Sequence, residues 1–128
     1  MVSKNQIKLV RSLESKKGRS KEGLFVAEGP KVVADLMAVI KPRTIFATSE
    51  WIEEYGWEKT DSVFEVSNDE LRSISFLKHP QHVIALFPMP GSCSCVVAPN
   101  NLELYLALDD VQDPGNLGTI IRIADWFG

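Results

Sequence analysis

The fold class is decided by one short stretch, Leu24-Phe25-Val26-Ala27-Glu28-Gly29-Pro30. Its four leading apolar residues predict a short buried strand. Pro30 suits the first position of a helix, where a missing N–H costs nothing. Apolar residues then recur from Val33 to Ile40 at the spacing i, i+3, i+4, i+7, which predicts an amphipathic helix. A strand that runs directly into a helix indicates an α/β fold.

The same alternation of strands and helices extends over most of the chain. Ser3 with Gln6, and Ser67 with Glu70, have the spacing of capping boxes and predict two helix starts. Further strands are expected at residues 44–48, 63–66 and 83–87, and a short helix is expected to be capped by Ser49 and to end near Gly56. Short strands between helices favour an α/β/α layered domain over residues 1–90.

The rest of the chain has a different pattern. Residues 91–101 are expected to form a linker, because the stretch from Pro88 to Asn101 contains three prolines together with glycine, serine and asparagine. A strand is expected at residues 102–108, followed by a helix that begins near Asn116, a good capping residue. One strand and one helix cannot bury their own faces. We therefore expect residues 102–128 to open a second domain that continues beyond Gly128.

The composition is that of a globular protein, with 45% hydrophobic and 24% charged residues in 128. No apolar run approaches the ~20 residues needed to cross a bilayer, and the N-terminus has no apolar signal region. A cytoplasmic location is expected, with no membrane association. Cys93 and Cys95 could join His79 and His82 in a zinc site. Turns explain both histidines, so no metal is expected, and the cysteines are expected to be free thiols.

Charge is distributed unevenly along the chain, whose net charge is −3. Residues 1–31 hold eight basic and three acidic residues, or +5, whereas the remainder holds six basic and fourteen acidic residues, or −8. A basic end on an acidic protein suits a partner that carries phosphates. Residues 16–23 are expected to be a basic loop with two glycines that can approach such a backbone closely. The alternative, a solvated charged surface, remains open.

The segment that begins at Asp113 combines a polar turn with a helix that has two faces. About 100° separates successive residues of a helix, so the apolar side chains share one face; they are Leu117, Ile120, Ile121, Ala124 and Phe127. Arg122 lies on another face, one turn after Gly118. A guanidinium near a helix N-terminus can hold a phosphate in a fork. An ion pair with Asp113 or Asp125 is the alternative.

Three stretches resemble one known family. Residues 108–128, LDDVQDPGNLGTIIRIADWFG, closely resemble the first signature motif of SpoU/TrmH-family RNA ribose methyltransferases. Residues 25–33, FVAEGPKVV, are similar to the start of that family's substrate-binding domain, which is itself similar to ribosomal and kink-turn-binding RNA proteins. Residues 78–85, KHPQHVIA, resemble a stretch near the end of the same domain.

The resemblance implies a reaction and an assembly. The family transfers a methyl group from S-adenosylmethionine to a ribose 2′-hydroxyl of rRNA or tRNA. Its catalytic domain has the SPOUT trefoil-knot fold and usually forms a homodimer. The ligands of S-adenosylmethionine are expected beyond residue 128, so residues 1–128 alone are expected to be inactive. By position in the motif, Arg122 would lie at the reacting ribose, Asn116 would shape the active site, Asp113 and Gly115 would set the turn, and Gly118 would keep the approach open.

The resemblance also makes RNA the expected partner of the basic end. The residues expected to bind it are Lys16, Lys17, Arg19, Lys21 and Lys31. A structural role at the strand end is favoured for Glu28. Core packing is favoured over base stacking for Trp51, Tyr55 and Trp57.

Two other functions remain as alternatives. The first is a non-catalytic RNA-binding module that resembles a ribosomal protein. The second is a nucleotide enzyme, which the missing G-x-G-x-x-G and Gly-Lys-Ser/Thr motifs disfavour.

Overall fold

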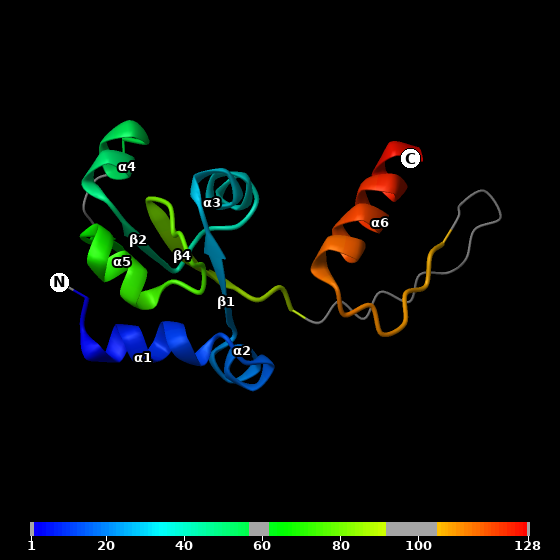
Figure 1. Ribbon diagram of the computed structural model, residues 1–128, viewed down its shortest axis with the longest axis horizontal. Helices are drawn as coiled ribbons and strands as arrows, with labels where there is room; N and C mark the ends of the chain where they lie inside the picture. The colour runs from blue at the N-terminus through cyan, green and yellow to red at the C-terminus, as the bar shows by residue number, and fades with distance from the viewer. Residues whose placement is uncertain (1, 57–61, 92–104, 128) are drawn as a thin grey trace. The chain divides into compact units, whose positions relative to one another are not determined.

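The computed structural model describes residues 2–56, 62–91 and 105–127 (Figure 1). The chain divides into two compact units, Met1–Cys93 and Ser94–Gly128. In chain order the elements of the first unit are α1 (Lys4–Ser12), α2 (Lys16–Glu22), β1 (Leu24–Glu28), α3 (Pro30–Met37), β2 (Thr44–Ala47), α4 (Ser49–Glu54), β3 (Val63–Glu65), α5 (Asn68–Ile74) and β4 (Val83–Pro88). The second unit contains α6 (Pro114–Phe127).

The first unit is built on a four-stranded sheet with the order β1-β4-β2-β3. Strand β4 is antiparallel to both of its neighbours, with Leu86 opposite Val26 of β1 and Thr44 of β2. Strands β2 and β3 are parallel. The sheet therefore has β1 at one edge and β3 at the other, and β4, whose residues are buried from Val83 to Phe87, lies inside it.

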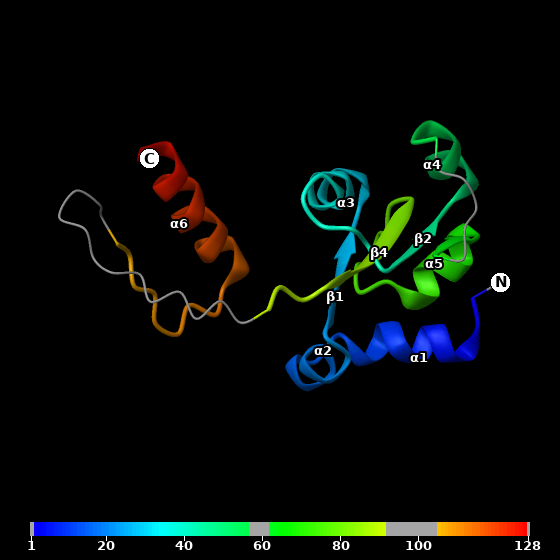
Figure 2. The same ribbon diagram turned by 180° about the vertical axis from the view of Figure 1, so that it is seen from behind.

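Helices cover both faces of this sheet (Figures 1 and 2). Ile84 and Leu86 of β4 belong to a core cluster with residues of α1 and α5. The alternate residues, Val83, Ala85 and Phe87, belong to a second cluster with residues of α3 and α4. Because successive side chains of a strand point to opposite faces, one apolar strand supplies both cores. The expected α/β/α layering is confirmed.

Both expected capping boxes are present. The hydroxyl of Ser3 accepts from the backbone N–H of Gln6, whose side chain accepts from the backbone N–H of Ser3. Ser67 and Glu70 do the same at the start of α5. Glu70 also accepts from the backbone N–H of Val2, at 2.9 Å, and so ties the N-terminus to α5. The N–H groups of Ser67 and then Val2 lower the pKa of Glu70 below its usual 4.5.

This shift predicts a pH dependence of stability. A carboxyl whose pKa is lowered by folding stabilises the fold above its unfolded pKa, and this stabilisation is lost as the pH falls through the folded pKa. We expect Glu70→Gln to lose less stability on acidification than the wild-type chain. Urea unfolding from pH 7 to pH 3 measures this, with Glu53→Gln on α4 as the control. Equal pH slopes for wild type and Glu70→Gln would contradict the assignment.

The prediction of a basic loop at residues 16–23 is wrong, because Lys16–Glu22 form helix α2 and Gly23 ends it. Ser15 caps it by accepting from the N–H of Gly18, and Gly23 ends it in the left-handed conformation at φ 64°. A Cβ on Gly18 would lie 1.8 Å from the carbonyl oxygen of Ser12. Gly18 therefore lets α2 pack closely against the end of α1. Its role is in this packing, and not in bringing a loop close to a phosphate backbone as the sequence suggested.

Other expected boundaries also shift. Thr48, and not Ser49, is the N-cap of α4. Helix α6 begins before Asn116, because Asp113 caps it by accepting from the N–H groups of Gly115 at 2.6 Å and Asn116 at 3.1 Å. Residues 105–108, the described part of the expected strand 102–108, form no strand. A strand needs a neighbour for its backbone hydrogen bonds, and the described residues of this unit offer none.

Candidate functional site

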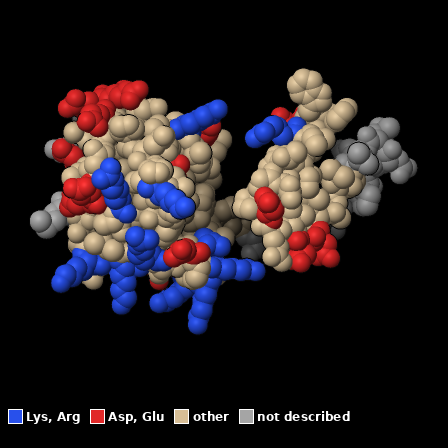
Figure 3. Space-filling view, viewed as in Figure 1, with Lys and Arg blue, Asp and Glu red and all other residues tan. Residues whose placement is uncertain are grey.

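Helices α1 and α2 carry a basic face. Lys and Arg side chains gather along the surface over these helices, whereas acidic side chains gather over α4 (Figure 3). The cations of α1 and α2 are Lys4, Lys8, Arg11, Lys16, Lys17, Arg19 and Lys21. The four predicted residues of α2 therefore lie within a larger cationic face that includes α1, which the sequence prediction did not include.

The arginines and lysines of this face have different surroundings. Arg19 donates from Nη1 to the carbonyl oxygens of Leu13, at 3.0 Å, and Glu14, at 2.7 Å, so it ties α2 to the end of α1. Arg11 donates to the carbonyl oxygen of Ser73 at 2.8 Å. The lysines are exposed. Lys21 lies 3.7 Å from Glu22 in a solvent-accessible pair, which contributes little to stability.

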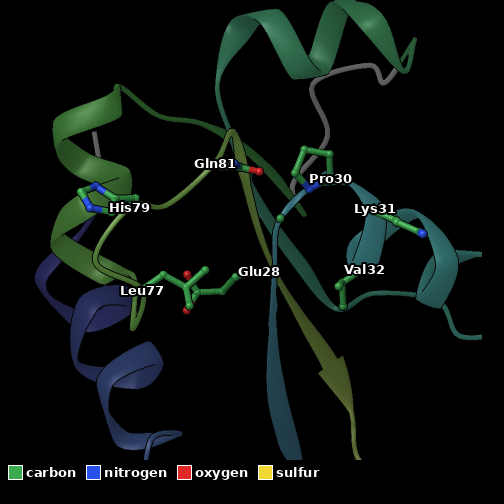
Figure 4. A pocket seen from close by; sticks show the side chains of 8 residues that line it. Glu28, Pro30, Lys31, Val32, Leu77, His79 and Gln81 are labelled. Atoms are coloured by element: carbon green, nitrogen blue, oxygen red, sulfur yellow. The ribbon is translucent and has the colours of Figure 1, made fainter. Parts of the chain in front are cut away.

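Lys31 lies apart from this face. It is in the first turn of α3, which packs on the other face of the sheet from α1. There it lines a cavity of about 330 Å³ together with Glu28, His79 and Gln81 (Figure 4). The five predicted RNA-binding residues are therefore four neighbours on α2 and one separate residue.

Glu28 has the structural role that was favoured. Its carboxylate accepts from the backbone N–H of Phe76, at 2.9 Å, and from the hydroxyl of Ser75. These bonds tie the end of β1 to the segment that follows α5. In Figure 4 Glu28 lies beside Leu77, with Lys31 on the other side of β1.

Trp51 and Tyr55 have different exposure. Trp51 is 1% exposed and belongs to the second core cluster, which confirms core packing. Tyr55 stacks on it with ring centroids 4.7 Å apart and is itself 41% exposed. Trp57 lies outside the described residues.

Around Arg122 the helix surface is open. A Cβ on Gly118 would meet no atom within 4 Å, whereas one on Gly115 would lie 3.0 Å from Oδ1 of Asp113. Arg122 lines a groove of about 270 Å³ with Thr119, Ile123, Trp126 and Phe127. In the described part of the chain, no ion pair joins Arg122 to Asp113 or Asp125, and the carboxylate of Asp113 caps the helix instead. The guanidinium is thus exposed and available to a ligand.

One cavity was missed by sequence reasoning. It measures about 390 Å³ and lies where α1, α2, β1 and the segment after α5 meet. Its lining residues are Leu13, Glu14, Arg19, Phe25, Val26 and Phe76. Phe76 is fifty or more residues from the others in the sequence, so no local pattern links them.

The remaining site predictions concern metals and membranes. Among residues 2–56, 62–91 and 105–127, no group of three or more His, Cys, Asp or Glu side chains could hold a metal ion. Cys93 and Cys95 lie outside these ranges. No helix in the described ranges is both long and apolar enough to span a membrane.

Comparison with known proteins identifies the family. Residues 4–85, which span nearly the whole first unit, match the MRM3-like substrate binding domain. The chain belongs to the SpoU/TrmH family of RNA methyltransferases. Its MRM3-like domain is the layered first unit, and the motif with Arg122 lies in the second.

Three SpoU/TrmH relatives show how far the similarity extends. The mouse mitochondrial rRNA methyltransferase 3 is 32% identical over 91% of this chain and 30% of its own length. The Bacillus subtilis 23S rRNA (guanosine(2553)-2′-O)-methyltransferase RlmP is 31% identical over 98% of this chain and 50% of its own. A crystal structure of an AdoMet-bound rRNA methyltransferase from Sinorhizobium meliloti superposes with a TM-score of 0.74 at 35% identity, covering 98% of this chain and 49% of that one. The chain therefore spans half or less of the length of each.

Proposed function

We propose that this chain is the RNA-binding domain and the opening of the catalytic domain of an RNA 2′-O-ribose methyltransferase. One observation supports this most: a single chain joins an MRM3-like substrate-binding domain to the motif that contains Arg122. The names of the relatives support it too, because one is a 2′-O-methyltransferase of 23S rRNA and another was solved with AdoMet. The substrate would be rRNA or tRNA, and the methyl donor S-adenosylmethionine.

In this proposal residues 1–90 bind the RNA, residues 91–101 link the domains and residues 102–128 begin the methyltransferase domain. Lys16, Lys17 and Lys21 contact phosphates, because they are exposed cations on one helix. Arg19 uses one nitrogen to hold α1 and offers its remaining N–H groups to the RNA. Lys31 makes a separate contact from α3.

Arg122 is the proposed catalytic residue. The ribose 2′-hydroxyl passes its proton to an adjacent RNA phosphate as its oxygen takes up the methyl group. S-adenosylmethionine, when bound, would supply that methyl group and leave as a neutral thioether. A guanidinium is a poor base, since its pKa exceeds ~12. Its positive charge and paired donors can instead stabilise the developing 2′-oxyanion. The open surface around Gly118 leaves room for the ribose to approach this charge.

The other motif residues prepare this place. Asp113 and Gly115 fix the turn, because the carboxylate caps α6 and leaves no room for a side chain larger than hydrogen at Gly115 without movement. Asn116, exposed in the first turn, faces solvent and shapes the active site. No residue of the described part is assigned to S-adenosylmethionine, whose ligands we place beyond residue 128.

The apolar side chains of α6, including Leu117 and Ile121, are exposed in the described residues. A complete catalytic domain would cover them, and we propose that it forms the homodimer of the family. We propose a cytoplasmic location. The mouse relative is named as a mitochondrial enzyme. A localisation experiment that found this protein in mitochondria would therefore contradict the proposed cytoplasmic location.

A non-catalytic RNA-binding module is the second candidate. The first unit has its own two-sided core and carries its own basic face, so it could act without the methyltransferase chemistry. The two candidates predict the same RNA binding and differ only in methyl transfer.

RNA binding by residues 1–128 tests what both candidates share. We expect a fluorescently labelled rRNA hairpin to bind with an affinity that falls steeply as salt rises from about 50 to about 200 mM, because bound lysines release counterions from the phosphates. Fluorescence anisotropy measures the dissociation constant at each salt concentration. Binding that is absent, or that does not change with salt, would contradict the proposed role of the basic face.

A further inference from the structure

The cavity between α1, α2, β1 and the segment after α5 has a volume suited to a small-molecule or nucleotide ligand. Its volume of about 390 Å³ lies within the range of about 300 to 1,000 Å³ typical of ligand pockets. Its walls are mainly apolar and aromatic, with two charged side chains, Arg19 and Glu14. The cavity lies at the edge strand β1, which pairs with β4 on one side only in the described sheet.

Two phenylalanines and one arginine, Arg19, give this cavity its stacking surfaces. Phe25 is half-buried and stacks on Phe87, with ring centroids 5.7 Å apart. Phe76 is also half-buried, and the guanidinium of Arg11 lies 5.9 Å from its ring centroid. Arg19 is held by the carbonyl groups at the end of α1. Aromatic rings and guanidinium planes fixed in this way are the surfaces on which unpaired bases stack.

Glu14 is unusual on this basic end of the chain. The other two acids of residues 1–31 are engaged: Glu22 lies beside Lys21, and Glu28 accepts from Ser75 and Phe76. In the described residues the carboxylate of Glu14 has no such partner, and it lines the cavity. An anion here would oppose the binding of a phosphate. It would accept hydrogen bonds from the imino and amino groups of a base.

We propose that this cavity binds one unpaired base of the RNA, with a preference for guanine. This inference rests on the proposed RNA-binding function of the first unit. Phe76 and Arg19 supply the stacking surfaces, and Glu14 accepts from the Watson–Crick edge. Guanine presents two neighbouring donors there, N1–H and N2–H, which match the two oxygens of a carboxylate. The lysines of α2 hold the flanking phosphates.

Three RNA hairpins of the same stem test this with residues 1–128. One has a single bulged guanosine, one a bulged uridine, and one is fully paired. We expect the hairpin with the bulged guanosine to bind at least about tenfold more tightly than the paired stem, because one base stacked on an aromatic side chain improves affinity by about this factor. Phe76→Leu should reduce this advantage to about twofold while leaving affinity for the paired stem unchanged. Glu14→Ala should remove the preference for guanosine over uridine.

Matched variants separate the cavity from general effects. Phe64→Leu changes another half-buried phenylalanine of the same core cluster, on the opposite edge strand, and should keep the bulge advantage. Glu22→Ala removes a nearby acid outside the cavity and should raise all affinities without changing the base preference. Thermal unfolding of each variant shows that it is folded.

The outcomes distinguish this inference from the proposed function. Equal binding of all three hairpins, or a Phe76→Leu variant that keeps the full bulge advantage, would overturn the base pocket while RNA binding still stands. Absence of binding to every hairpin would overturn both. Equal affinity for bulged guanosine and bulged uridine in the wild type would overturn the role of Glu14.

Discussion

Replacing Arg122 by alanine is expected to lower the methyl-transfer rate by about 10²- to 10³-fold, a loss typical of removing one donor to a developing oxyanion. The variant belongs in a protein that extends this chain through a complete catalytic domain. S-adenosylmethionine should still bind with nearly unchanged affinity, because its proposed ligands lie beyond residue 128. Single-turnover transfer of a radiolabelled methyl group measures the rate, and calorimetry measures cofactor binding.

Two further variants make this test specific. Arg122→Lys keeps the charge but loses the planar fork, so we expect it to recover only part of the rate. Asp125→Ala removes a charge from the same exposed helix three residues later and should leave the rate within about twofold, because Asp125 is exposed and, in the described residues, forms no ion pair with Arg122. Full turnover by Arg122→Ala would rule out the role proposed for this residue.

Removing Lys16, Lys17 and Lys21 together is expected to flatten the salt dependence of RNA binding. Each phosphate contact that is lost should reduce the slope of log affinity against log salt by about one, so the triple alanine variant should lose about three. Anisotropy titrations on residues 1–128 give this slope. Arg19 stays intact here because its bonds to Leu13 and Glu14 hold α2 in place, and its removal would confuse binding with folding.

A charge-matched variant is the control for this experiment. Lys41, Arg43 and Arg72 are exposed cations outside α1 and α2, and replacing them by alanine changes the net charge by the same amount. We expect the control to keep a slope close to that of the wild type. If the two triple variants lose the same slope, binding follows net charge and not the basic face.

Much of the fold could be predicted because its signals are local. The strand at residues 24–28 and the helix that Pro30 begins follow from adjacent residues. The two capping boxes follow from pairs three residues apart. The layering follows because β4 is apolar on both faces, as a strand covered by helices on each side must be.

The features that sequence missed depend on competing or distant signals. Helix α2 consists of Lys, Gly, Arg, Ser and Glu without an apolar face, so its caps, Ser15 and Gly23, were the only local sign of a helix. At α6, Asp113 and Asn116 are both good capping residues, and Pro114 decides between them because it fits the first helical position. The cavity with Phe76 requires the folded sheet, since no short segment contains it.

The location of the transferred methyl group tests the central claim most directly. A 2′-O-methyl group blocks the attack of the ribose oxygen on the adjacent phosphodiester, so alkaline hydrolysis of RNA methylated by the extended protein should leave one resistant linkage. We predict that all of the radiolabel from S-adenosylmethionine is recovered in this alkali-resistant dinucleotide. Label recovered on a base, or RNA that remains unlabelled while it binds the protein normally, would contradict the account.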